Sequence, residues 1–169
     1  MSARGAVTSS STIWSPGGVP GGPNIGLTLA TTETVKFYYS HTSHWITSDQ
    51  TNEIATAPGN LQSGLGCNGD WDPGCLRSWL QDLDGDGVYT LETDELPGGN
   101  YEFKVAVGES WDENYGVGGV PGGDNLTFSV ASGELERISW NSTTKVPTVE
   151  VLSSSRNEGR GHNSRDSLY

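Results

Sequence analysis

The sequence predicts an all-β fold, and three observations support this prediction. Glycine accounts for 24 of the 169 residues, about twice its usual share. Hydrophobic residues make up only 33% of the chain. The apolar residues fall in short runs that alternate with polar residues and are separated by turn formers. This combination is typical of a domain built from short strands and many turns.

The strongest strand signals lie in three segments. Residues 35–46 alternate in polarity and are rich in β-branched and aromatic side chains. Residues 87–93 contain the run Val-Tyr-Thr-Leu, and residues 100–107 alternate with period two. Weaker strand signals lie at residues 125–131, 135–141 and 146–151, a short helical turn is expected at residues 75–80, and a turn is expected at residues 97–99.

An internal repeat determines the expected domain organisation. The string Gly-Gly-Val-Pro-Gly-Gly occurs at residues 17–22 and again at residues 118–123, and the flanking residues align at the same offset of 101 positions. Identical pairs at this offset include Asn24 with Asn125, Ala30 with Ala131, Glu33 with Glu134, Thr42 with Thr143, and Thr47 with Thr148. The spacing is the size of one domain and exceeds the repeat length of solenoids.

The repeat predicts one complete module preceded by part of another. We expect an irregular segment at residues 1–13, the closing strands of a preceding copy with a linker at 14–55, the complete module at 56–151, and a polar, disordered tail at 152–169. The partial copy leads us to expect that the natural polypeptide begins upstream. Two or three orphan strands cannot close a sandwich and leave unpaired sheet edges.

Charge and cysteine usage restrict the partners and the compartment. The net charge of −12 and the isoelectric point near 4.4 argue against nucleic acid or an anionic membrane as a partner. Residues 1–11 lack the apolar core of a signal peptide. Cys67 and Cys75 enclose a loop rich in turn formers, so a disulfide is favoured over two free thiols. We therefore expect an oxidising, extracellular or cell-surface location.

Three aspartates at alternate positions form the string D-x-D-x-D-G. Asp82, Asp84 and Asp86, followed by Gly87, match the first half of a calcium-binding loop, where carboxylates converge on one hard cation. The twelfth position, which carries a bidentate glutamate in such loops, is Thr93. Adjoining Asp-Gly steps are also a hairpin signal. The hairpin is the favoured interpretation, calcium is the alternative, and no other cofactor is indicated.

Tryptophans flanked by polar residues suggest a sugar-binding surface. Trp71 lies in the cysteine loop, and Trp111 is followed closely by Asp112, Asn114 and Tyr115. A flat aromatic ring can cover the apolar face of a pyranose while neighbouring polar groups bind its hydroxyls. The alternative is that both tryptophans cap a sandwich core and find partners for their indole N–H groups.

The sequence gives little support for catalysis. Asp112 and Glu113 are adjacent, and adjacent strand residues point to opposite faces, whereas glycosidases need two carboxyls facing one bond. His41 and His44 belong to the partial copy, and their counterparts in the complete copy are serine and lysine. No phosphate-binding loop or nucleophile elbow is found. We therefore expect a non-catalytic chain.

Four ordered motifs carry a resemblance to a known family. They lie at residues 62–73, 82–90, 96–104 and 110–116. In this order they resemble the accessory β-modules found in tandem in bacterial pullulanases and related secreted starch-degrading enzymes. They are also distantly similar to glycogen-binding domains, which are immunoglobulin-like sandwiches. The resemblance implies an immunoglobulin-like β-sandwich, here with extra N-terminal strands from a truncated preceding copy.

The resemblance also suggests functions. The preferred hypothesis is a non-catalytic accessory module of an extracellular pullulanase-like enzyme, whose partners are α-glucan or neighbouring domains of the same enzyme. Sugar contact would involve Trp71, Trp111, Asp112, Asn114 and Tyr115, although such modules often serve as spacers. The alternative is a structural subunit that self-associates through its N-terminal strands into a filament. A third hypothesis is a gene fragment whose partial copy has no role.

Overall fold

The structure, a computed structural model, describes residues 27–28, 32 and 34–152. The expected irregular segment at residues 1–13 lies outside this part of the chain, as does the expected tail at residues 152–169 except for Leu152, which ends strand β11. Within it, the prediction of an all-β fold is confirmed: the elements are antiparallel strands and two short 3₁₀ turns. They are β1 (Phe37–Tyr39), β2 (Ile46–Ser48), β3 (Ala55–Thr56), η1 (Leu76–Ser78), β4 (Trp79–Leu80), β5 (Val88–Thr93), β6 (Gly99–Phe103), β7 (Val105–Val107), β8 (Glu113–Tyr115), η2 (Val117–Gly119), β9 (Leu126–Val130), β10 (Leu135–Asn141) and β11 (Pro147–Leu152).

Two of the predicted strands are each divided in the structure. The segment 35–46 forms the hairpin β1–β2, because residues 40–45 make a turn in which His44 adopts a positive φ of 60°. The segment 100–107 is interrupted at Lys104, because β6 pairs with β9 whereas β7 pairs with β3 and β8. The predicted helical turn at residues 75–80 corresponds to η1, which β4 follows directly.

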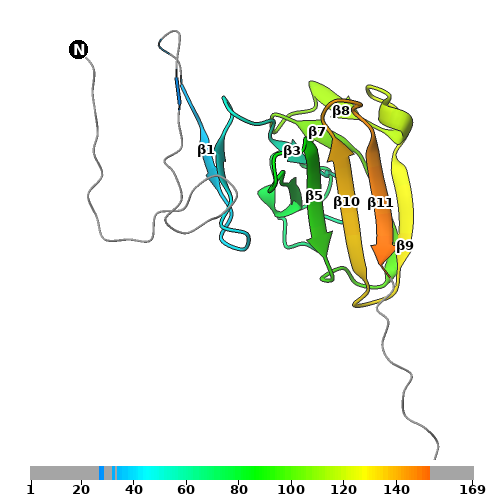
Figure 1. Cartoon of the computed structure of the whole chain (residues 1–169). Coiled ribbons are helices and arrows are strands. Elements are labelled where there is room, and N and C mark those ends of the chain that lie inside the picture. Colours follow the sequence, from blue (N-terminus) through cyan, green and yellow to red (C-terminus); the bar gives the residue numbers. More distant parts are fainter. Residues whose placement is uncertain (1–26, 29–31, 33, 153–169) are drawn as a thin grey trace, which may run out of the picture.

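The strands form a β-sandwich with a separate hairpin beside it (Figure 1). One sheet has the order β11-β10-β5, and the other has the order β4-β3-β7-β8. Strands β6 and β9 form an additional pair, and among the described strands β1 pairs only with β2. Among the described residues, no helix has the length and apolar character needed to cross a bilayer.

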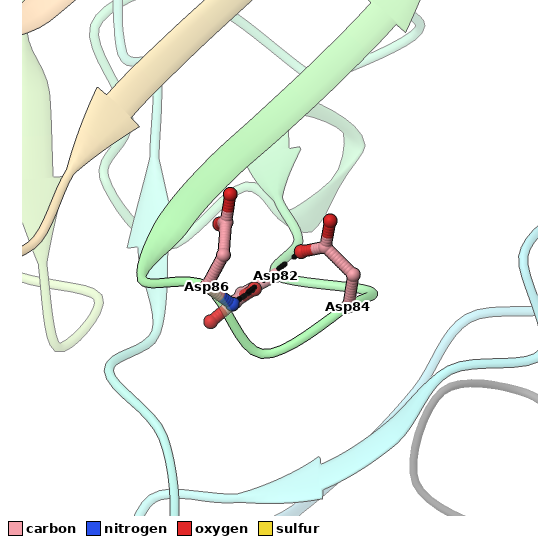
Figure 2. A group of neighbouring side chains, drawn as sticks. All are labelled: Asp82, Asp84 and Asp86. Carbon is pink, nitrogen blue, oxygen red and sulfur yellow. Dashed lines mark hydrogen bonds between the residues drawn. The ribbon is translucent and has the colours of Figure 1, made fainter.

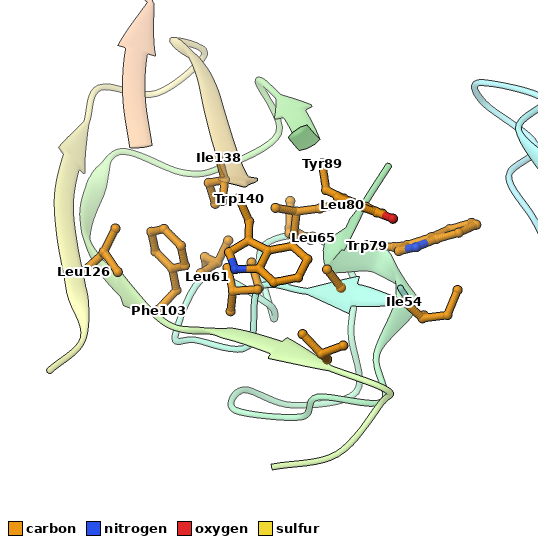
Figure 3. Close-up of a cluster of buried hydrophobic side chains, with 14 of the residues drawn as sticks. Ile54, Leu61, Leu65, Trp79, Leu80, Tyr89, Phe103, Leu126, Ile138 and Trp140 are labelled. Atoms are coloured by element: carbon orange, nitrogen blue, oxygen red, sulfur yellow. The ribbon is translucent and has the colours of Figure 1, made fainter. Parts of the chain in front are cut away.

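The core lies between the two sheets and is centred on Trp140 (Figure 3). Strand β10 alternates, so that Ile138 and Trp140 point inward and are almost fully buried. The Trp140 ring lies 5.5 Å from the ring of Tyr89 on β5 and stacks at 6.0 Å on Tyr115 of β8. Because Tyr115 belongs to the opposite sheet, this contact joins the two layers. Phe103 on β6 is also fully buried.

Candidate functional site

The loop between Cys67 and Cys75 fixes the position of Trp71. A disulfide joins the two cysteines, whose Cα atoms are 6.1 Å apart. The buried side chain of Gln62 makes two hydrogen bonds to the backbone of this loop. Its amide N–H donates to the Asp72 carbonyl at 2.7 Å, and its Oε1 accepts from the Asp72 N–H at 2.8 Å. Trp71 is half-buried and has a φ of 61°, a region that bulky residues occupy only when their surroundings enforce it.

Trp111 lies on the loop between β7 and β8 and is 40% exposed. The loop is organised by its own polar residues. The side-chain amide of Asn114 donates to the Trp111 carbonyl at 2.8 Å, and the Ser110 hydroxyl donates to the Asp112 carboxylate at 3.1 Å. Asp112, the next residue in the chain, is also exposed. The loop therefore carries an exposed aromatic residue and an exposed carboxylate at consecutive positions.

Tyr115 is oriented toward the core rather than toward solvent. Its ring stacks on Trp140, and its hydroxyl donates to Glu113 at 2.7 Å. The hydrogen bond to Glu113, followed by burial, raises the pKa of Tyr115. Tyr115 and the Asn114 side chain therefore already have intramolecular partners, which leaves Trp111 and Asp112 as the exposed members of the predicted sugar-contacting set.

The structure places Trp71 and Trp111 near opposite ends of β7. The backbone N–H of Trp71 donates to the carbonyl of Gly59, and Gly59 forms an isolated β-bridge with Phe103, just before β7. Trp111 belongs to the loop that follows Val107 at the other end of the strand. Val107 lies four positions after Phe103, which in extended chain is roughly 13 Å. The two indoles are thus two separate aromatic positions and not one continuous platform.

The three predicted metal ligands come together in a turn before β5 (Figure 2). One carboxylate oxygen from each of Asp82, Asp84 and Asp86 lies within 4.8 Å of the others. Asp82 is buried and accepts hydrogen bonds from the N–H groups of Gly85, Asp86 and Gly87 at 2.8 to 3.1 Å. The Asp86 carboxylate also accepts from the N–H of Val88 at 2.7 Å, so the aspartates close the turn by hydrogen bonds of their own, as the hairpin interpretation requires.

The same turn supplies an incomplete set of ligands for calcium. Asp84 and Asp86 are exposed, and their carboxylates can turn toward a cation beside Asp82. A full calcium site takes six to eight oxygens. Thr93 cannot add one, because it ends the extended strand β5, five residues and roughly 16 Å beyond Val88. The residues present fit a weak, solvent-rich site.

Two grooves beside the hairpin β1–β2 were not predicted from the sequence. The larger one, of about 1110 Å³, lies between Tyr39 and His41 on the hairpin and Arg77, Trp79 and Glu92 on the sandwich. Its walls come from segments some forty or more positions apart in the chain, so no local pattern reveals it. The pairing of aromatic with charged side chains is chemically suited to a polar ligand.

The smaller groove, of about 620 Å³, is lined by several carboxylates that already have partners. Lys145 beside it makes ion pairs with Glu53 at 2.9 Å and Glu113 at 3.7 Å. Its ammonium also lies 4.9 Å from the centre of the Trp140 ring. Burial alone would lower the pKa of Lys145, but Glu53 and Glu113 raise it on balance. These carboxylates are therefore used in holding the sandwich together.

The antiparallel sandwich, with a disulfide-tied loop and an exposed loop tryptophan, defines the class of small all-β accessory modules. Within this class, the model of the Pullulanase X25 domain family matches residues 54–147. The chain belongs to that family, and the resemblance seen in its four motifs is confirmed.

Curated relatives are amylopullulanases. The enzyme of Thermoanaerobacterium saccharolyticum is 34% identical over 125 residues, which are 70% of this chain and 10% of that protein. The enzyme of Thermoanaerobacter thermohydrosulfuricus is 35% identical over 124 residues, which are 70% of this chain and 8% of that protein. The chain thus spans a tenth or less of the length of these relatives.

A solved structure shows the same fold. The pullulanase from Bacillus acidopullulyticus superposes with a TM-score of 0.51 at 24% identity, over 62% of this chain and 13% of that chain. At this level of identity, the likeness shows the fold alone, and it supports the β-sandwich.

Proposed function

We propose that the chain is a non-catalytic accessory module of an extracellular starch-degrading enzyme and that it contacts α-glucan at the β7–β8 loop. The observation that carries this proposal is Trp111, which is 40% exposed on a loop ordered by its own hydrogen bonds. A loop that is already ordered loses little conformational freedom on binding. Neighbouring domains of the same polypeptide are the second class of partner, since its relatives are long enzymes.

The other predicted contacts take supporting roles in this proposal. Trp71 offers a second, partly exposed ring at the far end of β7, which suits a separate turn of a polysaccharide. Asn114 and Tyr115 shape the loop from inside through their own hydrogen bonds. We place the module at residues 56–151, with Ala55 joining it as the first residue of β3, and the hairpin β1–β2 belongs to the preceding segment, residues 14–55. A calcium ion at Asp82, Asp84 and Asp86 would stiffen the turn before β5 without contacting sugar.

Affinity electrophoresis in amylopectin gels tests the proposed glucan contact. The wild-type chain is expected to be retarded, and Trp111→Ala is expected to lose about tenfold or more in affinity, because one stacked aromatic ring contributes roughly that much. Phe37→Ala is the matched control, since Phe37 is an aromatic residue on the hairpin that is 60% exposed. Equal retardation of all three proteins, or none, would refute glucan binding at Trp111 and leave domain spacing as the function.

One observation favours a second candidate, the filament subunit. Phe37 and Tyr39 on β1 are 60% and 40% exposed, and β1 pairs only with β2 among the described residues. A strand with one unpaired edge and exposed aromatic residues is a template for strand addition by another chain. Sedimentation over a range of protein concentrations tests this: assembly predicts growing species, and a monomer at high concentration rules it out.

A further inference from the structure

The hairpin β1–β2 is fastened to the sandwich by an aromatic contact. Tyr38 and Trp45 are 7% and 3% exposed, and their rings lie 5.9 Å and 5.1 Å from the ring of Trp79 on β4. Trp79 itself is only 5% exposed. Three large rings are thus removed from water at this junction, which is a substantial apolar contact for so short a hairpin.

Polar contacts surround the three rings. Glu109, on the loop after β7, accepts hydrogen bonds from the Lys36 ammonium at 2.8 Å and from the Tyr38 hydroxyl at 2.6 Å. On the other side, the Ser43 hydroxyl donates to the side-chain carbonyl of Gln81. An apolar centre with a polar rim is the usual anatomy of a protein interface.

Comparison with β10–β11 shows that the hairpin is packed through the opposite face. At the offset of 101 positions, Phe37 and Tyr39 correspond to Ile138 and Trp140, and Tyr38 corresponds to the partly exposed Ser139. Ile138 and Trp140 fill the core of the sandwich, whereas Phe37 and Tyr39 are exposed. The hairpins otherwise match, since His44 and Lys145 occupy the same turn position with φ of 60° and 62°.

The face of β1–β2 that packs on the sandwich carries larger apolar side chains than the corresponding face of β10–β11. Tyr38 and Trp45 are aromatic, whereas the corresponding positions of the second copy carry Ser139 and Val146. The outer face of a sandwich normally carries polar residues. Two aromatic residues on that face, in one copy only, therefore indicate a surface made for contact with another body.

We propose that Tyr38, Trp45, Trp79 and Glu109 form the interface between two consecutive modules of this fold. In this arrangement β1–β2 is the closing hairpin of the first module. The exposed face of the hairpin, which carries Phe37 and Tyr39, is then the face that the other strands of the first module cover. The repeat determines what covers this face: in the complete module, Tyr115 of the opposite sheet stacks on Trp140 at the matching position. The interface holds the two modules in one orientation, and this holds whether or not they bind glucan.

Hydrogen exchange of the full 169-residue chain tests the packed face. The substitutions Tyr38→Ser and Trp45→Val install the residues of the second copy, so the hairpin keeps side chains that this turn accepts. Amides of β2 are expected to exchange about tenfold faster or more, the equivalent of losing one large buried side chain. Phe37→Ser on the opposite face of β1 is the matched control and is expected to leave docking unchanged.

A second variant approaches the same interface from the sandwich. Glu109→Gln weakens the contacts with Lys36 and Tyr38 without altering the hairpin, and it is expected to speed β2 exchange in the same direction. The interface is refuted if β2 exchanges freely in the wild-type chain, or if the variants on both sides leave its protection unchanged.

An extended chain tests the proposed occupant of the exposed face. The extended chain carries a second copy of residues 54–114 fused directly before residue 14. Because position 14 corresponds to position 115 at the offset of 101, this fusion restores the order of a complete first module. The amides of β1 are expected to become as protected from hydrogen exchange as those of β10. Small-angle scattering is expected to show the two modules in one fixed orientation, which the substitution Trp45→Val makes variable. Unchanged exposure of β1, or its protection only through dimerisation of the unextended chain, would overturn the proposal.

Discussion

Replacing the buried carboxyl of Glu136 with valine is expected to stabilise the sandwich at neutral pH. Glu136 lies on β10, is 0% exposed, and neither of its carboxylate oxygens has a hydrogen-bond partner among the residues that the structure describes. Burial, together with the charges of Asp94 and Glu134, raises its pKa. Val35 occupies the corresponding position of the partial copy, which shows that the repeat accepts an apolar residue there.

The sign of the pH dependence follows from the raised pKa of Glu136. The Glu136 carboxyl binds its proton more tightly in the folded protein than in the unfolded chain. The contribution of Glu136 to stability is therefore fully present below the pKa of the unfolded chain, about 4.3, and is lost as pH rises through the pKa of the folded protein. An unsatisfied buried polar group costs about 1–3 kcal/mol. The protonated carboxyl is still unsatisfied, so we expect Glu136→Val to gain about that much at pH 4 and more at pH 7.5, where the buried carboxyl is charged.

Urea unfolding of both proteins at pH 4 and pH 7.5 measures this difference. Glu150→Val is the matched control, because Glu150 is exposed on the neighbouring strand β11 and its removal changes the net charge equally. A gain in Glu136→Val that is no larger than in Glu150→Val, or that is the same at both pH values, would refute the reasoning.

Three further predictions concern the sandwich and its loops. Lys145→Ala is expected to lower the free energy of unfolding by about 1–2 kcal/mol, since it removes two ion pairs and the contact with the Trp140 ring. Chemical denaturation measures this loss, with Lys104→Ala as the control variant. An equal loss of stability in both variants would count against a special role of Lys145. Reducing the bond between Cys67 and Cys75, eight positions apart, is expected to cost about 2–3 kcal/mol; thermal melts with and without reductant check it, and unchanged melting would contradict it. Calorimetric titration of the chelator-treated chain is expected to show weak calcium binding that Asp84→Asn with Asp86→Asn abolishes while the fold is kept; no heat in the wild type rules the site out.

Local sequence patterns were sufficient for most of the fold. β10 could be predicted because its alternation matches its burial at Ile138 and Trp140, whereas the burial of Glu136 runs against the pattern. β3 and β4, of two residues each, have no pattern of their own and exist because they pair with each other. The break at Lys104 could not be predicted either, because the alternation continues while the chain passes from β9 to β3 as its partner.

The candidate site was only partly predictable for the same physical reason. Exposure of Trp111 follows from its loop, and the sequence places it beside Asp112. The orientation of Tyr115 toward Trp140 depends on how the two sheets pack, which no local pattern contains. The same holds for the packed face of the hairpin, because the burial of Tyr38 is decided by Trp79, some forty positions away.

The indole N–H signals of the tryptophans in a nitrogen–proton correlation spectrum provide the most direct test of the proposed glucan contact. Trp79 and Trp140 are buried and serve as internal references for a protein whose fold is unchanged. On addition of soluble α-glucan, the Trp111 signal is expected to shift in a saturable manner while those two signals stay in place. A Trp111 signal that does not move at saturating glucan would contradict the account.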